Sequence, residues 1–190
     1  MRFLITALGS SGDIHPFMGI GTELAARGHE VILLANQHFE DVIVRAGLGF
    51  HAVGPADYYR TMMAEPRLWH PVHAFPTLAK LVLAPSYEPI FRAIRELRGP
   101  GRTVLVGSSL AVAARNAQEA FGLPMVTVHL APLLFMSRHR QPRMPSFGLP
   151  EAAPLWLKRL NGWLIDRWLD WLTLPALNRF RESVGLAPVR

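Results

Sequence analysis

A short turn near the amino terminus gathers the side chains whose types could do chemistry. It reads Gly-Ser-Ser-Gly-Asp-Ile-His-Pro over residues 9–16 and holds one carboxylate, Asp13, and one imidazole, His15. Gly9 and Gly12 allow the backbone to bend sharply and to approach a ligand closely. A carboxylate placed at the mouth of a cleft can take a proton from a substrate hydroxyl as a general base.

Both titratable side chains of this turn also have an interpretation without chemistry. Asp is a preferred capping residue at helix amino termini, where the helix dipole favours negative charge. Asp13 therefore either stabilises a helix that follows or acts as a base. His15 is either a base or ligand, or a residue that faces solvent or caps the turn. The residues alone leave these alternatives open.

The segments on either side of the turn predict the unit that positions it. Residues 2–8 form an apolar run of strand length, residues 17–27 carry apolar side chains at helical spacing, and residues 30–35 form a β-branched run. Pro16 suits the first turn of the helix, so Asp13 would lie just before it. Strand, turn, helix and strand predict a βαβ unit with parallel strands. Ligands bind such sheets at the carboxyl ends of the strands, where this turn lies.

The alternation of strands and helices continues, with one interruption, to residue 130. The predicted elements are a helix over 37–46, a strand over 50–53, helices over 72–84 and 86–97 separated at Pro85, a strand over 103–106, a helix over 110–121 and a strand over 125–130. This order predicts an α/β fold, a Rossmann-like doubly wound parallel sheet flanked by helices. We expect this domain core to span residues 1–135.

The interruption covers residues 56–71, which are rich in large side chains without a clear period. Tyr58, Tyr59, Met62 and Trp69 are among them. Aromatic and methionine side chains in such a segment either line an acceptor pocket or cover one end of the core.

A second group of candidate residues follows the fourth predicted strand. Ser108 and Ser109 stand there, on the same edge of the sheet as Asp13. Ser108 could bond Asp13 or an acceptor, or it could cap the following helix. His129, near the end of the fifth strand, is expected to be a core or rim residue. The candidate substrate-binding residues are therefore Gly9, Ser10, Ser11, Gly12, His15, Ser108 and Ser109.

Residues 136–190 are predicted to form a carboxyl-terminal extension. Residues 137–150 are basic and proline-rich, which fits either a solvated loop or a lid over an anionic group. A tryptophan-rich helix is predicted over 154–172, and Pro175 separates it from a helix over 176–184. The tryptophan-rich helix would lie in a membrane interface or pack against another domain or the same core.

Composition bounds the class of protein. The chain has 190 residues, half of them hydrophobic, which predicts one globular domain with a real core. It has no cysteine, which excludes a disulfide scaffold and fits a reducing compartment. We find no run with the apolar length of a membrane span and no signal peptide. We expect a cytoplasmic protein, with peripheral contact at the inner face of the membrane as a further option.

The charge is +6 and is carried by eighteen arginines against two lysines. The arginines are scattered and form no cluster typical of a nucleic-acid reader, so we expect no nucleic-acid partner. An anionic membrane surface, or anionic donors and lipids, fits the charge better. The same composition is also simply typical of a GC-rich bacterial genome.

Nucleotide-binding and metal-binding motifs are missing. The dinucleotide fingerprint needs G-x-G-x-x-G and an acid about 20 residues later, whereas this turn has only G-x-x-G and the second strand ends in Ala35-Asn36. No Gly-Lys-Ser/Thr of a P-loop follows, and no two histidines share ligand spacing on one helix. These absences disfavour an oxidoreductase, and we expect neither a cofactor nor a metal.

The turn and the helix after it resemble the amino terminus of nucleotide-sugar glycosyltransferases of the GT-B fold. The resemblance rests on Gly9-Ser-Ser-Gly-Asp-Ile-His-Pro-Phe and on the segment from Gly21 to Val31. More narrowly, it is to the family 28 N-terminal and family 1 (UDP-glycosyltransferase-like) group. That group includes sterol glucosyltransferases, macrolide and glycopeptide glycosyltransferases and the rhamnosyltransferases that build rhamnolipids. Tyr-Arg-Thr-Met at 59–62 and Arg-Leu-Trp at 67–69 resemble the last of these.

This resemblance implies a role for Asp13. Many members read G-[ST]-x-G-D-x-x-P, which the chain matches at Gly9, Ser10, Gly12, Asp13 and Pro16. The aspartate of that pattern is the candidate base that deprotonates the acceptor hydroxyl, and the implied reaction transfers a hexose from a nucleotide-sugar with inversion. His15 lies two residues beyond the aspartate of this pattern, so the resemblance implies no catalytic role for it.

The resemblance also implies that part of an active enzyme is missing. The family has two domains of similar size, and nothing in this chain resembles the motif with which the second binds the nucleotide-sugar. We therefore expect the acceptor-side half, inactive alone, with a carboxyl-terminal donor domain or subunit as partner.

The acceptor is expected to be apolar. The Met-, Trp- and Phe-rich central region favours a hydroxy-fatty acid, a sterol or a polyketide over a sugar. The competing hypothesis is a non-catalytic Rossmann-like module that binds a lipid or a partner subunit.

Overall fold

Five parallel strands form one sheet in the order β3-β2-β1-β4-β5. The computed structural model describes residues 1–99, 101–131, 148–150 and 152–190. The strands are β1 (Arg2–Thr6), β2 (Glu30–Ala35), β3 (Gly49–Ala52), β4 (Thr103–Ser108) and β5 (Met125–Val128). Thr6 pairs with Leu34 on one side and with Gly107 on the other, so the strand order reverses between β1 and β4. The predicted doubly wound α/β fold is confirmed.

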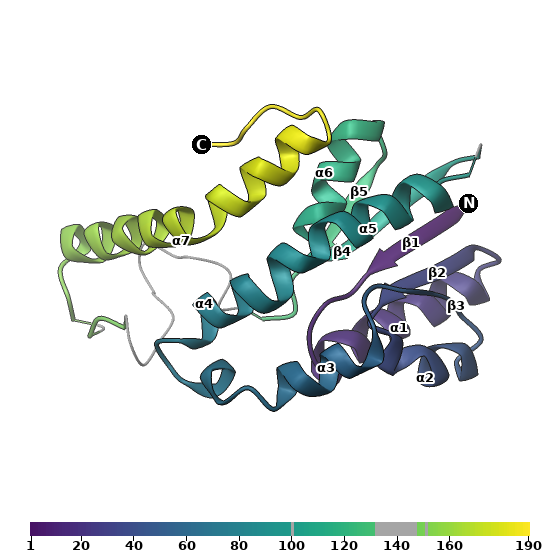
Figure 1. Cartoon of the computed structure of the whole chain (residues 1–190), viewed down its shortest axis with the longest axis horizontal. Coiled ribbons are helices and arrows are strands. Elements are labelled where there is room, and N and C mark those ends of the chain that lie inside the picture. The colour runs from purple at the N-terminus through teal and green to yellow at the C-terminus, as the bar shows by residue number, and fades with distance from the viewer. Residues whose placement is uncertain (100, 132–147, 151) are drawn as a thin grey trace.

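Helices cover both faces of this sheet (Figure 1). They are α1 (Ser11–Ala26), η1 (Gln37–Phe39), α2 (Glu40–Arg45), α3 (Ala56–Met63), η2 (Pro66–Trp69), α4 (Ala74–Leu78), η3 (Ala79–Leu83), α5 (Ala84–Leu97), α6 (Val112–Phe121) and α7 (Leu155–Ser183). None of the helices in the described ranges is long and apolar enough to cross a membrane.

The core has two halves because successive strand residues point to opposite faces of the sheet. On one face Leu4 and Leu105 pack with Ile90 and Ile94 of α5 and with Phe180 of α7. On the other face the core is built from residues of β1, β2, α1 and α2, namely Ile5, Leu33, Ile14, Phe17 and Ile43. Full burial of each such side chain contributes roughly 1.5–3 kcal/mol. The strands therefore hold their carboxyl ends, and the turn that follows β1, at fixed positions.

Helix α1 begins at Ser11, earlier than the predicted start at residue 17. Ser10 is its N-cap, and Asp13 in the first turn bonds back to the cap. The sequence predicted a later start because the first two helical residues, Ser11 and Gly12, have no apolar side chains that would mark helical spacing. Asp13 thus lies inside the first turn and not before the helix. Pro16 lies within the helix and not in its first turn.

Residues 56–71, predicted to be irregular, contain helix α3 and the short helix η2. Helix α3 buries Met62 and exposes Asp57 and Arg60, which form an ion pair on its outer side. Two tyrosines in succession conceal this amphipathic pattern in the sequence.

The predicted helix break at Pro85 does not occur, because α4, η3 and α5 follow one another without a gap. Segment η3 is π-helical and lies immediately before Pro85. A proline has no N–H to donate and its ring clashes with the carbonyl four residues earlier, here that of Leu81. The wider π turn accommodates this defect and keeps the helix continuous.

Helix α7 also continues through a proline, Pro175, where the sequence predicted an end. Figure 1 shows α7 as two arms that meet at an angle, as expected where a proline removes one backbone hydrogen bond. The carboxyl-terminal arm buries Phe180 and Arg181. Residues 132–147, most of the predicted basic loop, lie outside the described residues, and the division at residues 135 and 136 stays a prediction.

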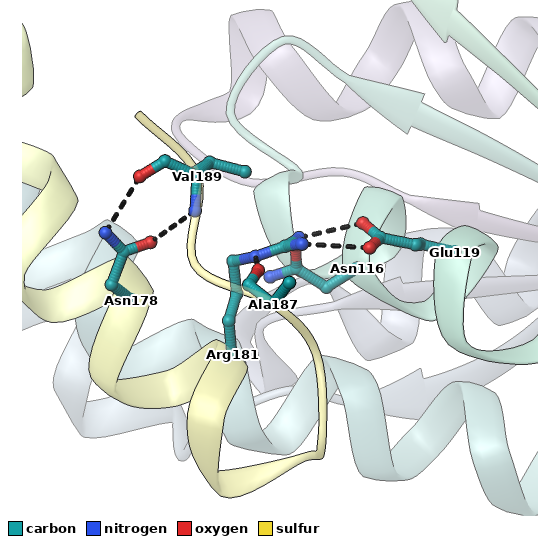
Figure 2. A network of polar contacts seen from close by, with 6 residues as sticks. All are labelled: Asn116, Glu119, Asn178, Arg181, Ala187 and Val189. Atoms are coloured by element: carbon teal, nitrogen blue, oxygen red, sulfur yellow. Dashed lines mark hydrogen bonds and ion pairs between the residues drawn. The ribbon is translucent and has the colours of Figure 1, made fainter.

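Arg181 attaches α7 to α6 (Figure 2). Its guanidinium donates to Glu119 through Nη1 and Nη2, both at 2.9 Å, and to Oδ1 of Asn116 at 2.9 Å. Its Nε donates to the carbonyl of Ala187. The hydrogen bond from Arg181, with its charge, holds the pKa of Glu119 below the usual value. This network fixes the last turns of the chain against the sheet's helical layer.

Candidate functional site

A cavity of about 230 Å³ lies at the carboxyl ends of β1, β2 and β3. Its wall is formed by the turns after these strands, by α1 and α3, and by the helix around the π turn. The lining residues are Ala7, Leu8, Gly9, Ile14, Asn36, Val53, Gly54, Pro55, Tyr58, Tyr59, Met62, Val82, Pro85, Ser86 and Pro89. None of them is charged, so the cavity suits an uncharged and largely apolar group.

Gly9 connects this cavity to Asp13. It lines the cavity, and its φ of +125° belongs to a region that favours glycine. A Cβ added to Gly9 would lie 2.2 Å from Oδ2 of Asp13, so the carboxylate packs directly against this residue. Ile14, on the other side of Asp13 in the sequence, also lines the cavity. The carboxylate therefore borders the cavity across one glycine.

The Asp13 side chain is half-buried and is held by Ser10. Its Oδ2 accepts hydrogen bonds from the N–H of Ser10 at 2.8 Å and from the Oγ of Ser10 at 3.0 Å. The capping interpretation of Asp13 is thus realised in the structure. Within the described part of the chain Oδ1 makes no hydrogen bond, so that oxygen has an open position for a proton.

The other turn residues are placed differently from Asp13. Ser11, Gly12 and His15 are exposed near the start of α1, and none of them belongs to the cavity wall. Gly9, Ser10 and Asp13 are thus the predicted turn residues that the structure brings together. A substrate-binding role for Ser11, Gly12 and His15 stays a prediction.

Ser108 and Ser109 stand at the end of β4, beside β1 at the point where the strand order reverses. Ser108 is buried and its Oγ has no hydrogen-bond partner among the described residues, so the suggested bond to Asp13 is not formed. The Oγ of Ser109 lies 2.8 Å from Nδ1 of His129. His129 is exposed, as expected of a rim residue. Neither serine lines the cavity, and their roles stay predictions.

One side of the cavity is aromatic. The ring of Tyr59 stacks on His38 at a centroid distance of 4.4 Å and meets the edge of Phe39 at 5.0 Å. Beside it, burial raises the pKa of the Tyr58 hydroxyl, which has no hydrogen-bond partner among the described residues. The phenol of Tyr58 is therefore neutral across the physiological pH range.

Several cavity residues were not found from the sequence. Val82, Pro85, Ser86 and Pro89 lie on a helix whose apolar positions look like ordinary core, and only the fold shows that they meet the turn after β1. Tyr58, Tyr59 and Met62 do belong to the segment that was a candidate pocket wall. Asn36 had one usable signal, since it directly follows a buried strand. No group of three potential metal ligands is found in the described ranges.

Residues 3–84 match the glycosyltransferase family 28 N-terminal domain. This part of the chain is a family 28 N-terminal domain. It includes β1 to β3, the capped turn with Asp13, and most of the cavity wall. The predicted family is confirmed.

Two curated relatives cover different lengths of the chain. It is 29% identical over 195 residues to O-mycaminosyltylonolide 6-deoxyallosyltransferase of Streptomyces fradiae, covering 99% of this chain and 44% of that protein. It is 36% identical over 64 residues to sterol 3-beta-glucosyltransferase of Kluyveromyces lactis, covering 33% of this chain and 5% of that protein. The chain therefore spans less than half the length of these relatives.

Solved structures share the fold over the whole chain. The glycosyltransferase SsfS6 of Streptomyces sp. SF2575, complexed with thymidine diphosphate, matches with a TM-score of 0.58 at 16% identity, covering 100% of this chain and 47% of that one. Other glycosyltransferase structures match with TM-scores from 0.55 to 0.64. The chain thus has the fold of the N-terminal half of GT-B glycosyltransferases. The narrower likeness to the rhamnosyltransferases that build rhamnolipids stays a prediction.

Proposed function

We propose that this chain is the acceptor-side half of a glycosyltransferase that moves a hexose from a nucleotide-sugar to a hydroxyl of an apolar acceptor. The observation that carries the proposal is the uncharged cavity at the strand ends whose wall, at Gly9, touches the Asp13 carboxylate. The names of the relatives from Streptomyces fradiae and Kluyveromyces lactis, a deoxyallosyltransferase and a sterol glucosyltransferase, fit an apolar acceptor.

In this proposal Asp13 is the general base. An acceptor hydroxyl at the Gly9 end of the cavity hydrogen-bonds to the Asp13 carboxylate, which packs against Gly9 and which Ser10 holds through Oδ2. As the acceptor oxygen attacks the anomeric carbon of the sugar, its proton passes to Asp13. The bond from that carbon to the phosphate oxygen breaks, and the nucleoside diphosphate leaves with the electron pair. A base held close to its proton contributes roughly 10²–10⁴-fold to the rate.

The donor belongs mainly to a second half in this scheme. The family 28 match ends at residue 84, and the chain covers 44% of the Streptomyces fradiae relative. We infer that the nucleotide-sugar is bound by a carboxyl-terminal domain or subunit and that this chain alone does not turn over. A cytoplasmic location belongs to the same proposal, with peripheral membrane contact as an option that the exposed tryptophans on α7 and the net charge of +6 support.

A second candidate function is favoured by the hydrogen bonds of Asp13 itself. Because Oδ2 accepts two hydrogen bonds from Ser10, capping alone accounts for an aspartate at this position. In that case the chain is a non-catalytic module that binds a lipid or a partner subunit through the same cavity.

Calorimetry on this chain tests whether it is only the acceptor side. We expect no micromolar binding of UDP or dTDP, because no nucleotide motif is present. We also expect transfer from dTDP-glucose to the probe acceptor 2-naphthol only after a donor half is added. Micromolar binding of either nucleotide to the chain alone would contradict the proposal that the donor is bound mainly by a second half. Acceptor binding without transfer in the mixture would favour the binding module.

A further inference from the structure

The cavity beside Gly9 has no group that could balance the charge of an ionised ligand. No Asp, Glu, Lys, Arg or His belongs to its lining. Among its amide and hydroxyl side chains, Asn36 donates to the carbonyl of Pro55 at 3.0 Å and Ser86 donates to the carbonyl of Leu83 at 2.7 Å. The hydroxyls of Tyr58 and Tyr59, which also line the cavity, can donate a hydrogen bond but carry no positive charge. A carboxylate or phosphate moved from water into this space would lose its hydration without gaining a counter-charge. The lining therefore selects against anionic ligands.

Part of the cavity wall has little side-chain freedom. Pro55, Pro85 and Pro89 have no side-chain rotation to lose, and Val82 is β-branched and buried. The continuous helix through η3 and α5 fixes the last three of these residues on one backbone. A flexible chain that enters such a space gives up many bond rotations, whereas a ring gives up few. A wall with little side-chain freedom therefore favours a preformed ring over an acyl chain.

The aromatic side of the cavity gives a flat ring a surface to pack on. Tyr59 is fixed by its stack on His38, with an interplanar angle of 16°, and by its edge contact with Phe39. Aromatic rings gain from offset stacking and edge contacts beyond the area that they bury. The cavity volume is about 230 Å³, which leaves room for a small system of fused rings.

We propose that the cavity selects an uncharged fused-ring acceptor and rejects fatty acids and other anionic acyl chains. The inference rests on the proposed function, since it specifies the acceptor of the same site. A hydroxyl on a ring seated in the cavity reaches Asp13 at the Gly9 end.

Three ten-carbon probes test this selection on the chain as it stands. At neutral pH 2-naphthol is an uncharged fused ring, 1-decanol an uncharged chain and decanoate a charged chain. Binding is followed by NMR of the methyl groups of Met62 and Val82, which line the cavity. We expect 2-naphthol to bind at least tenfold more tightly than 1-decanol, and decanoate to shift neither methyl group. Binding of either chain as tight as that of 2-naphthol, or no shift with 2-naphthol, would overturn the proposal.

Two substitutions of the same type locate the probe. Val82→Phe fills the cavity and should weaken 2-naphthol at least tenfold, whereas Val44→Phe on the exposed side of α2 should leave binding unchanged. Met62→Phe gives a second cavity-filling variant if Val82→Phe does not fold, as judged by circular dichroism. Equal binding by the cavity-filled and control variants would place the probe elsewhere and overturn the proposal.

The outcomes separate this inference from the proposed function. Transfer that depends on Asp13, together with tight decanoate binding, would overturn the ring selection alone. Ring binding at Met62 and Val82 without any Asp13-dependent transfer in the presence of a donor half would overturn the proposed reaction and leave the ring selection standing.

Discussion

The Asp13 carboxylate caps α1 through Oδ2 and packs against Gly9, which lines the cavity; its role as a base is the proposal. The residue types of the turn were enough to predict that Asp13 and Gly9 would lie at a strand end. The sequence could not show which of its polar residues would meet the cavity, because that depends on Val82 and Pro89, which are distant in the chain. Their apolar side chains look the same in a core and in a pocket wall.

Gly9 is the residue whose substitution tests this close contact. Gly9→Ala should destabilise the fold by about 2–4 kcal/mol, because the new Cβ would collide with Asp13 and the positive φ is strained for alanine. Chemical unfolding in urea measures the change. Gly19→Ala, in the interior of α1 with no atom near the new Cβ, is the control and should stabilise by up to about 1 kcal/mol. Equal effects of the two substitutions would show that Gly9 is not in contact with the carboxylate.

At the scale of elements, the strands were predicted closely and the helices less so. Strands β2, β4 and β5 are short runs rich in β-branched residues, which leaves few alternatives. The helices continue through Pro85 and Pro175 because apolar side chains that follow each proline are buried in the core. Tyr87 and Ile90 follow the first, and Phe180 follows the second. A proline costs a helix interior about 3 kcal/mol, which burial of two or three such side chains offsets.

The contact between α7 and α6 depends on Arg181. Arg181→Ala should lower the free energy of unfolding by about 2 kcal/mol, because it leaves the buried Oδ1 of Asn116 and the carbonyl of Ala187 without their donor. Urea unfolding followed by circular dichroism measures this loss. A change below about 0.5 kcal/mol would mean that the network does not hold the two helices together.

The same network predicts a dependence on pH. Arg181 lowers the pKa of Glu119 in the folded chain, so the stabilisation is complete above the usual glutamate range and is lost as pH falls through the lowered pKa. The urea midpoint of the natural chain should therefore fall more between pH 7 and pH 3 than that of Glu119→Gln. Other carboxylates titrate in both proteins and cancel in this comparison. Parallel pH profiles would contradict the assigned interaction.

At the scale of the whole molecule, the amino-terminal arm of α7 carries several exposed tryptophans. Trp156, Trp163 and Trp171 are between 57% and 75% exposed, whereas Trp168 is half-buried with its ring 6.1 Å from Phe75. Large exposed apolar side chains gathered on one element indicate an interaction surface. The predicted membrane or domain contact of this helix therefore concerns its exposed tryptophans.

Replacing the three exposed tryptophans by glutamine should change stability by less than about 0.5 kcal/mol each, since none is in the core. The triple variant should self-associate less in analytical ultracentrifugation. Trp168→Gln is the control and should cost about 1–2 kcal/mol, because its ring is half-buried. An average loss per tryptophan in the triple variant as large as the loss in Trp168→Gln would show that the exposed tryptophans are part of the folded core.

The most direct measurement of the central claim is the rate of transfer from dTDP-glucose to 2-naphthol by Asp13→Asn, in the chain combined with a donor half. Asparagine can still accept the hydrogen bond from the N–H of Ser10, so the helix cap is kept, but it cannot take a proton. Ser10→Ala removes a hydrogen bond to Oδ2 and keeps the carboxylate, so it should retain transfer within tenfold. We expect Asp13→Asn to melt within a few degrees of the natural chain and to lose at least about 100-fold in rate. A fully folded Asp13→Asn protein that transfers within tenfold of the natural rate would contradict the account and leave Asp13 with capping as its role.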